Sequence, residues 1–143
     1  MDNPKPVASE VSTAELLGAV KRFLVEAASP ALSGRDRFNA RVSANVLGII
    51  EREAALGPQL AALDRDAIAK WLPEQADGLD AAQAFARALA SRSIAPDPAL
   101  MSYLQARQLL VCAINNPRYA SLTIAQSRWH EAATESESMP TQI

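Results

Sequence analysis

Apolar side chains between Phe38 and Leu56 recur every three or four residues, which is the spacing of one face of an α-helix. At about 100° per residue, Phe38, Val42, Val46, Ile49 and Leu56 span less than roughly a third of the helix circumference. The period of two residues that a half-buried strand requires is missing along the 143-residue chain. The dominant pattern therefore predicts an all-α fold.

The composition agrees with a helical core. Hydrophobic residues make up 49% of the chain but aromatic residues only 5%, and about one residue in five is alanine, the best helix former. A chain of 143 residues fits one domain, and at this size folding buries roughly 68–70% of the unfolded surface. We therefore expect a core of Ala, Leu, Val and Ile side chains.

Proline and glycine divide the helical pattern into five segments. Ser12 and Glu15 form a capping box at the first start. Gly57 and Pro58 are typical of a helix end, as is Pro73. The expected helices cover residues 12–28, 35–56, 59–72, 79–92 and 98–114. The predicted fold is an irregular bundle of about five helices without a sheet, with the first, second and fifth helices at its centre.

The chain is expected to contain one domain with two irregular ends. Residues 1–11 hold two prolines and no periodicity, so they form an irregular lead. Residues 12–119 form a single helical domain. Residues 120–143 form a C-terminal tail that becomes disordered towards its end, because its last part is acidic and rich in Ser and Thr.

Charge and hydropathy argue against several classes of partner. The formal net charge is −2 and the isoelectric point about 5.4, so the chain lacks the clustered Lys and Arg of a nucleic-acid-binding surface. No apolar run approaches the roughly 20 residues that span a bilayer, and the N-terminus has no apolar signal region. We expect a soluble, cytoplasmic protein that binds neither nucleic acid nor a membrane.

No combination of residues predicts a reaction. His130 is the only histidine and precedes the tail, where a general base would be poorly positioned. Cys112 is the only cysteine and fits a buried, inert thiol better than a nucleophile. Gly34, Gly48 and Gly57 are isolated, so they do not form a phosphate-binding loop. We expect no enzyme activity, no metal and no cofactor.

One carboxylate lies where the second helix should be apolar. Glu53 falls between Val42 and Val46 on the helical wheel, and a buried Glu without a partner costs several kcal/mol. The structural interpretation is an ion pair with Arg107, which lies on the apolar stripe of the fifth helix. Other arginines, Arg22 and Arg118, are alternative partners.

The neighbouring polar residues allow a functional interpretation. Arg41, Asn45 and Arg52 lie beside the stripe and could rim a groove for a peptide or an anionic group, since the planar guanidinium binds carboxylate and phosphate well. After the last expected helix, Arg118 and Tyr119 could fold back onto the second helix, with the Tyr119 ring buried. Whether Asn45 is structural or functional stays open.

Three segments carry a resemblance to a known family. ELLGAVKRFL, RFNARVSANVLGIIEREAALG and INNPRY resemble small bacterial proteins that are classified as a domain of unknown function. Members share an ELLxAVxxFL helix, an FxxRVxxNxL helix ending in RE, and a closing NPRY. The resemblance covers residues 14–119 and implies an all-helical fold. The matching residues are Phe38, Arg41, Val42, Asn45, Leu47, Arg52, Glu53, Asn116, Pro117, Arg118 and Tyr119.

The resemblance implies a setting and no reaction. Such proteins are often encoded beside aminoglycoside-phosphotransferase-like kinases and acyl-CoA-dehydrogenase-like flavoproteins, so we expect an accessory protein that binds one of these partners. The alternative is a small-molecule or acyl-chain binding module, with an apolar pocket that opens near Arg41 or Arg52. A homo-oligomer is compatible with both.

Overall fold

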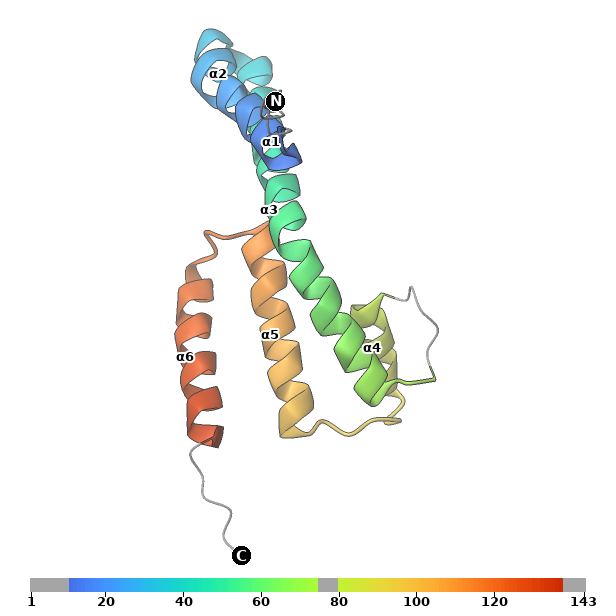
Figure 1. Ribbon diagram of the computed structural model, residues 1–143. Helices are drawn as coiled ribbons and strands as arrows, with labels where there is room; N and C mark the ends of the chain where they lie inside the picture. Colours follow the sequence, from blue (N-terminus) through green and yellow to red (C-terminus); the bar gives the residue numbers. More distant parts are fainter. Residues whose placement is uncertain (1–10, 75–79, 138–143) are drawn as a thin grey trace, which may run out of the picture. The chain divides into compact units, whose positions relative to one another are not determined.

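The computed structural model describes residues 11–74 and 80–137, with side chains as far as Trp129. This part of the chain is helical and contains no strand, which confirms the all-α class (Figure 1). Five of its helices have ten residues or more. The elements are α1 (Thr13–Arg22), a π-helical turn η1 (Phe23–Ala28), α2 (Ser29–Ala31), α3 (Gly34–Trp71), α4 (Ala81–Ala90), α5 (Pro98–Asn115) and α6 (Ala120–Glu137).

The first helix begins as predicted but ends later. Ser12 and Glu15 form the capping box, in which the Ser12 amide donates to the Glu15 carboxylate at 2.8 Å. The predicted end at Ala28 is wrong, because the helical path continues through η1 and α2, which contains Pro30. A proline ring clashes with the carbonyl four residues earlier in an α-helix, and the wider π-turn before Pro30 relieves that clash.

The predicted helix end at Gly57-Pro58 is also wrong. Helix α3 starts at Gly34, whose positive φ of 52° suits glycine, and runs to Trp71 with Pro58 inside it. An internal proline removes one backbone hydrogen bond and clashes with the carbonyl of the fourth preceding residue, here Ala54. The turn before Pro58 is therefore weakened, but the helix is not interrupted.

The chain divides into two compact units next to this turn. The first unit comprises Met1–Ala54 and the second Ala55–Ile143, so α3 contributes residues to both. Each unit has its own packing and is described separately below. The single domain predicted for residues 12–119 stays a prediction.

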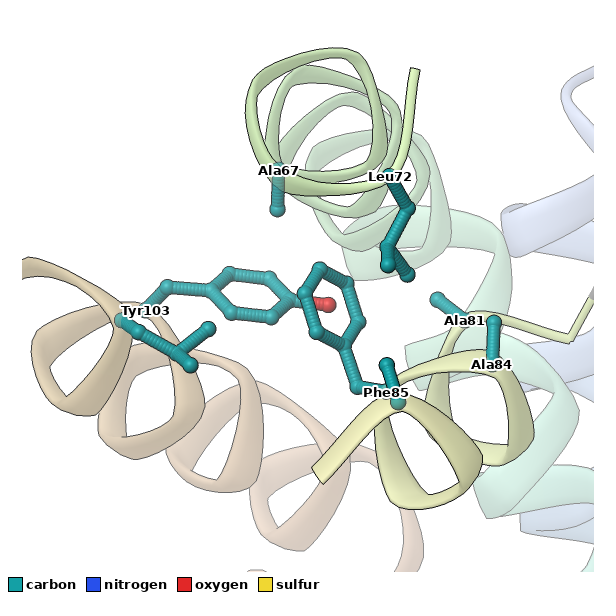
Figure 2. Packing of buried hydrophobic residues seen from close by; sticks show 8 residues of the cluster. Ala67, Leu72, Ala81, Ala84, Phe85 and Tyr103 are labelled. Atoms are coloured by element: carbon teal, nitrogen blue, oxygen red, sulfur yellow. The ribbon is translucent and has the colours of Figure 1, made fainter. Parts of the chain in front are cut away.

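The second unit contains the large hydrophobic cluster of the described chain. Phe85 on α4 and Leu100 on α5 are its most deeply buried large side chains, and the rings of Phe85 and Tyr103 lie 4.9 Å apart between their centroids (Figure 2). The remaining buried members come from the end of α3, from α4 and from α5: Ala67, Leu72, Ala81, Ala84, Ala88 and Tyr103. The predicted centre of the first, second and fifth helices leaves out α4, which supplies half of this cluster.

The first part of the predicted tail is helical. Helix α6 spans Ala120–Glu137 and packs along α5, with Leu122 buried (Figure 1). Leu122, Ala125 and Trp129 are three and four residues apart, which places them on one helix face. Polar residues separate these three apolar residues, so the pattern in the sequence did not predict a helix here. The lead at residues 1–10 and the disorder predicted for the end of the chain, residues 138–143, lie outside the described residues.

Candidate functional site

Helix α1 and the first part of α3 pack against each other through small residues. Ala40, Ala44 and Gly48 are buried on α3. On α1, a Cβ added at Gly18 would lie 3.9 Å from the carboxylate of Glu51. The fully buried positions on this part of α3 are therefore occupied by small residues.

An ion pair joins α1 to α3 at the same place. Lys21 Nζ on α1 donates to Glu51 Oε2 on α3 at 2.8 Å. The hydrogen bond and the positive charge of Lys21 lower the pKa of the Glu51 carboxyl, and the charge of Arg52 contributes in the same direction. Gly48 leaves room beside this pair, because a Cβ there would lie 3.1 Å from Arg52 Nη1 and 3.7 Å from Lys21 Nζ.

The large apolar side chains of the first unit are exposed. Among residues 11–54, none of the buried residues is larger than serine or alanine, and they are Ser29, Ala40, Ala44 and Gly48. Large apolar side chains in the same segment are 44–65% exposed: Val11, Leu16, Val20, Phe23, Val25, Phe38, Val42, Val46 and Ile50. The hydrophobic residues that predicted the second helix are therefore not those that contact the first helix.

Four of these side chains share one face of α3. At about 100° per residue, Phe38, Val42, Val46 and Ile50 lie about 120–240° around the helix from buried Ala44, so they point away from the buried side of α3. We call these four the apolar face: Phe38, Val42, Val46 and Ile50.

The polar residues that were predicted beside the apolar stripe of α3 differ from the prediction in their burial. Glu53 is exposed, so its burial among apolar side chains, the basis of the proposed pair with Arg107, is wrong. Arg41 and Asn45 are also exposed and border the apolar face, whereas Arg52 is partly buried near Glu51. The apolar stripe on the wheel faces away from α1, and this reversal explains the exposure of Glu53.

Arg118 and Tyr119 belong to the second unit. Both side chains are exposed, and the Tyr119 side chain is 53% exposed, so the predicted burial of its ring is wrong. Tyr119 instead precedes α6, where its carbonyl accepts a backbone hydrogen bond from Leu122 at 2.9 Å. The structure leaves these two residues available on the surface of their unit.

Arg107 pairs with a residue that the sequence did not single out for this role. Arg107 Nε lies 3.0 Å from Asp64 Oδ1 on α3, and the Tyr103 hydroxyl donates to the same oxygen at 2.8 Å. Asp64 lies in the interior of α3. Burial and the hydrogen bond to Asp64 raise the pKa of the Tyr103 phenol. Asp64 lies at helical spacing from Ala67 and Trp71, and this spacing could have placed Asp64 on the buried side of a continuous helix.

A pocket of about 300 Å³ lies beside this group. Its lining comes from one side of α4 and one side of α5 and is mostly apolar: Ala81, Ala82, Phe85, Ala86, Leu89, Tyr103, Leu104, Arg107 and Gln108. The Arg107 guanidinium is the charged group of this lining. Neither Arg41 nor Arg52 lines this pocket, and the opening predicted near these two residues stays a prediction.

Neither a membrane-spanning helix nor a metal-binding group occurs among the described residues. No helix in residues 11–74 and 80–137 is long and apolar enough to cross a membrane. The same part of the chain holds no group of three or more His, Cys, Asp or Glu side chains that could bind a metal ion. Cys112 is a free thiol of intermediate exposure, 3.8 Å from the Asn116 carbonyl oxygen.

The fold and these surfaces define an all-helical protein with one cored unit and one small-residue helix pair. The chain belongs to a family known as a domain of unknown function, DUF6285, whose model matches residues 30–119. The match covers all of α3, α4 and α5 but not α1. No curated protein and no solved structure matches the chain.

Proposed function

We propose that this protein is a non-catalytic helical interaction protein whose first unit is completed by another polypeptide. The observation that carries the proposal is the apolar face, four large hydrophobic side chains of α3 that are 44–65% exposed in a unit whose fully buried residues are all small. Contiguous exposed apolar patches of more than a few hundred Å² mark interaction sites in monomeric proteins. An accessory role follows from such a surface.

The titratable groups with shifted pKa values have structural partners, which supports the non-catalytic part of the proposal. The backbone and side chain of Ser12 lower the pKa of Glu15, and Lys21 lowers that of Glu51. Tyr103 is packed in the core beside Asp64. Each shift has its cause in a cap, a helix contact or core packing.

The resemblance supplies the proposed partner enzyme. A phosphotransferase-like or acyl-CoA-dehydrogenase-like protein would contact the first unit through Arg41, Asn45 and Arg52, where polar groups border the apolar face. Arg118 and Tyr119 would add contacts from the second unit. The bacterial origin and the cytoplasmic location are part of the same proposal.

The experiment uses purified full-length protein with each recombinant candidate enzyme. Hydrogen exchange of residues 11–54 should slow on addition of the true partner, and calorimetry should measure binding. Arg41→Ala and Asn45→Ala should each weaken binding about two- to tenfold, since a polar contact of this kind is worth roughly 0.5–1.5 kcal/mol. Arg87→Ala, an exposed arginine on α4, is the matched control and should leave binding unchanged. No added protection with either enzyme class would contradict the choice of partner.

A second candidate function rests on the pocket between α4 and α5. Its volume of about 300 Å³ and its apolar lining with Arg107 fit a short acyl chain that carries a carboxylate. Octanoate and octanoyl-CoA are suitable probes in a thermal-shift titration. Leu104→Trp should fill the pocket and abolish the shift, whereas Met101→Trp on the exposed side of the same helix should preserve it. An equal shift in both variants would exclude this pocket.

A further inference from the structure

We propose that Asp64 determines which head group the pocket between α4 and α5 binds, by restricting its ligand to a single negative charge. The inference deepens the second candidate function and rests on it, because it concerns the same pocket and adds the residue that sets its specificity. Its basis is one juxtaposition. Arg107 lines the pocket, and Asp64, which is not part of the lining, holds Arg107 by an ion pair.

The first step concerns the donors of the Arg107 guanidinium. A guanidinium carries five N–H donors, and the contact with Asp64 uses the one on Nε, at 3.0 Å. The same Asp64 oxygen accepts from the Tyr103 hydroxyl at 2.8 Å, so the carboxylate is held from two sides. The Asp64 contact does not use the four donors on the Nη atoms, which can therefore bind a ligand in the pocket that Arg107 lines.

The second step concerns the charge that a ligand meets. Among the described residues that line the pocket, Arg107 is charged and no side chain is acidic. Asp64 carries the opposite charge next to Arg107, and the two side chains are only 17% and 19% exposed. An anion in the pocket is therefore attracted by Arg107 and repelled by Asp64 across the guanidinium.

The third step compares these two interactions. An anion that binds the Nη donors lies roughly 4 Å from the charge of Arg107 and roughly 7 Å from that of Asp64, because a second hydrogen bond separates it from Asp64. At an effective permittivity of about 20, the repulsion is then about half of the attraction. A single negative charge is still bound. A doubly charged phosphate meets twice the repulsion, and the cost of removing it from water grows faster than its charge.

These interactions define the class of ligand. The apolar side chains of Phe85, Leu89 and Leu104 suit a short hydrocarbon chain, and Arg107 suits one carboxylate at its end. A phosphate monoester with the same chain is the ligand that Asp64 excludes. Without the charge of Asp64, the pocket would favour the phosphate.

Calorimetry of the purified full-length protein with octanoate and octyl phosphate tests the inference. At about pH 7.5 these probes carry one and close to two negative charges on the same eight-carbon chain. Wild-type protein should bind octyl phosphate no tighter than octanoate. Asp64→Asn should bind octanoate about tenfold tighter and octyl phosphate about a hundredfold tighter, because asparagine keeps an oxygen for Arg107 but removes the repelling charge.

Asp66→Asn is the matched control, because it makes the same change in charge at an exposed position of α3. It should leave both affinities within about twofold of the wild-type values. The ratio of the two affinities is the readout that a purely structural role of Asp64 would not change, since a loosened pocket would weaken both probes alike. An unchanged ratio in Asp64→Asn would overturn the inference.

A measurement without any variant covers the case in which Asp64→Asn fails to fold. Wild-type protein that binds octyl phosphate about tenfold tighter than octanoate would overturn the inference on its own. The outcomes also separate the inference from the second candidate function. Octanoate binding with a ratio that is independent of Asp64 would refute the inference and keep the pocket as a binding site. No binding of either probe would refute both.

Discussion

The two units of this chain are both helical, but their helices are held together by different side chains. The second unit buries aromatic and leucine side chains around Phe85 and Leu100, and its one described ion pair is beneath the surface. The first unit fully buries only alanine, glycine and serine, and many of its large apolar side chains are exposed. The same helical periodicity therefore produced a closed core in one unit and an open apolar face in the other. A hydrophobic stripe identifies a helix but does not identify what covers the stripe.

The largest expected effect concerns the core of the second unit. Leu100 has no exposed surface, and Leu100→Asp places an unpaired charge inside the cluster. Such a change costs about 4 kcal/mol or more, so α4 and α5 should lose their structure. Far-ultraviolet circular dichroism and urea unfolding measure the loss. Val46→Asp, measured at high dilution, should change the unfolding free energy by less than about 1 kcal/mol. Equal effects would remove the distinction between the two units.

The next effect concerns the hydrogen bonds around Asp64. Asp64→Asn should lower the free energy of unfolding by about 1–3 kcal/mol, because Arg107 loses its counter-charge and Tyr103 a charged acceptor. Asp66→Asn is the control, because Asp66 is exposed on the same helix. Chemical denaturation of the two variants measures the difference. Identical midpoints would show that this network does not stabilise the second unit.

A smaller effect tests how much room the contact between α1 and α3 leaves at Gly48. At Gly48 an added Cβ meets only the flexible ends of Arg52 and Lys21, so Gly48→Ala should be tolerated or stabilise by up to about 1 kcal/mol. Gly48→Leu should separate α1 from α3 and increase hydrogen exchange in residues 13–28. Hydrogen-exchange mass spectrometry on both variants measures this difference in exchange. A tolerated leucine would mean that α1 does not pack closely at this position.

The smallest effect is a pH dependence of the α1–α3 contact. Hydrogen bonding and charge from Lys21 lower the folded pKa of Glu51 below its usual value of 4.5. Its stabilisation is therefore present above pH 4.5 and is lost as the pH falls through the lower folded pKa. Glu51→Gln should remove this part of the acid sensitivity. The Glu15 capping box titrates in the same direction, so thermal melts between pH 3 and pH 7 are compared with those of Glu15→Gln.

The local signals in the sequence were sufficient for the caps and the fold class. Ser12 with Glu15 predicted a helix start that the structure confirms, and the helix predicted from residue 98 begins there with Asp97 as its cap, because a cap depends on residues within one helical turn. The helical period excluded strands for the same reason. Proline was a weaker guide. Pro58 predicted a helix end but lies inside α3, and Pro30 lies in a helical segment that follows a π-turn.

The candidate site could be predicted only in part. Arg41, Asn45 and Arg52 were found beside the apolar stripe, but the direction of that stripe was inferred from the rule that large apolar residues face the core. Here Ala44 and Gly48 face α1 instead, and Glu53 is exposed as a consequence. Asp64 was not recognised as a partner of Arg107, because residues 43 positions apart carry no local signal of contact.

Helix formation depends on interactions over three or four residues, so the amino-acid order alone settled the all-α class, the capping box and most helix starts. Which face of each helix is buried depends on residues far away in the chain. Packing joined two predicted helices into α3, extended the helical region to α6, and placed Asp64 against Arg107 and Tyr103. It also left the apolar face at the surface, because the fully buried side of this part of α3 is formed by the small residues Ala40, Ala44 and Gly48.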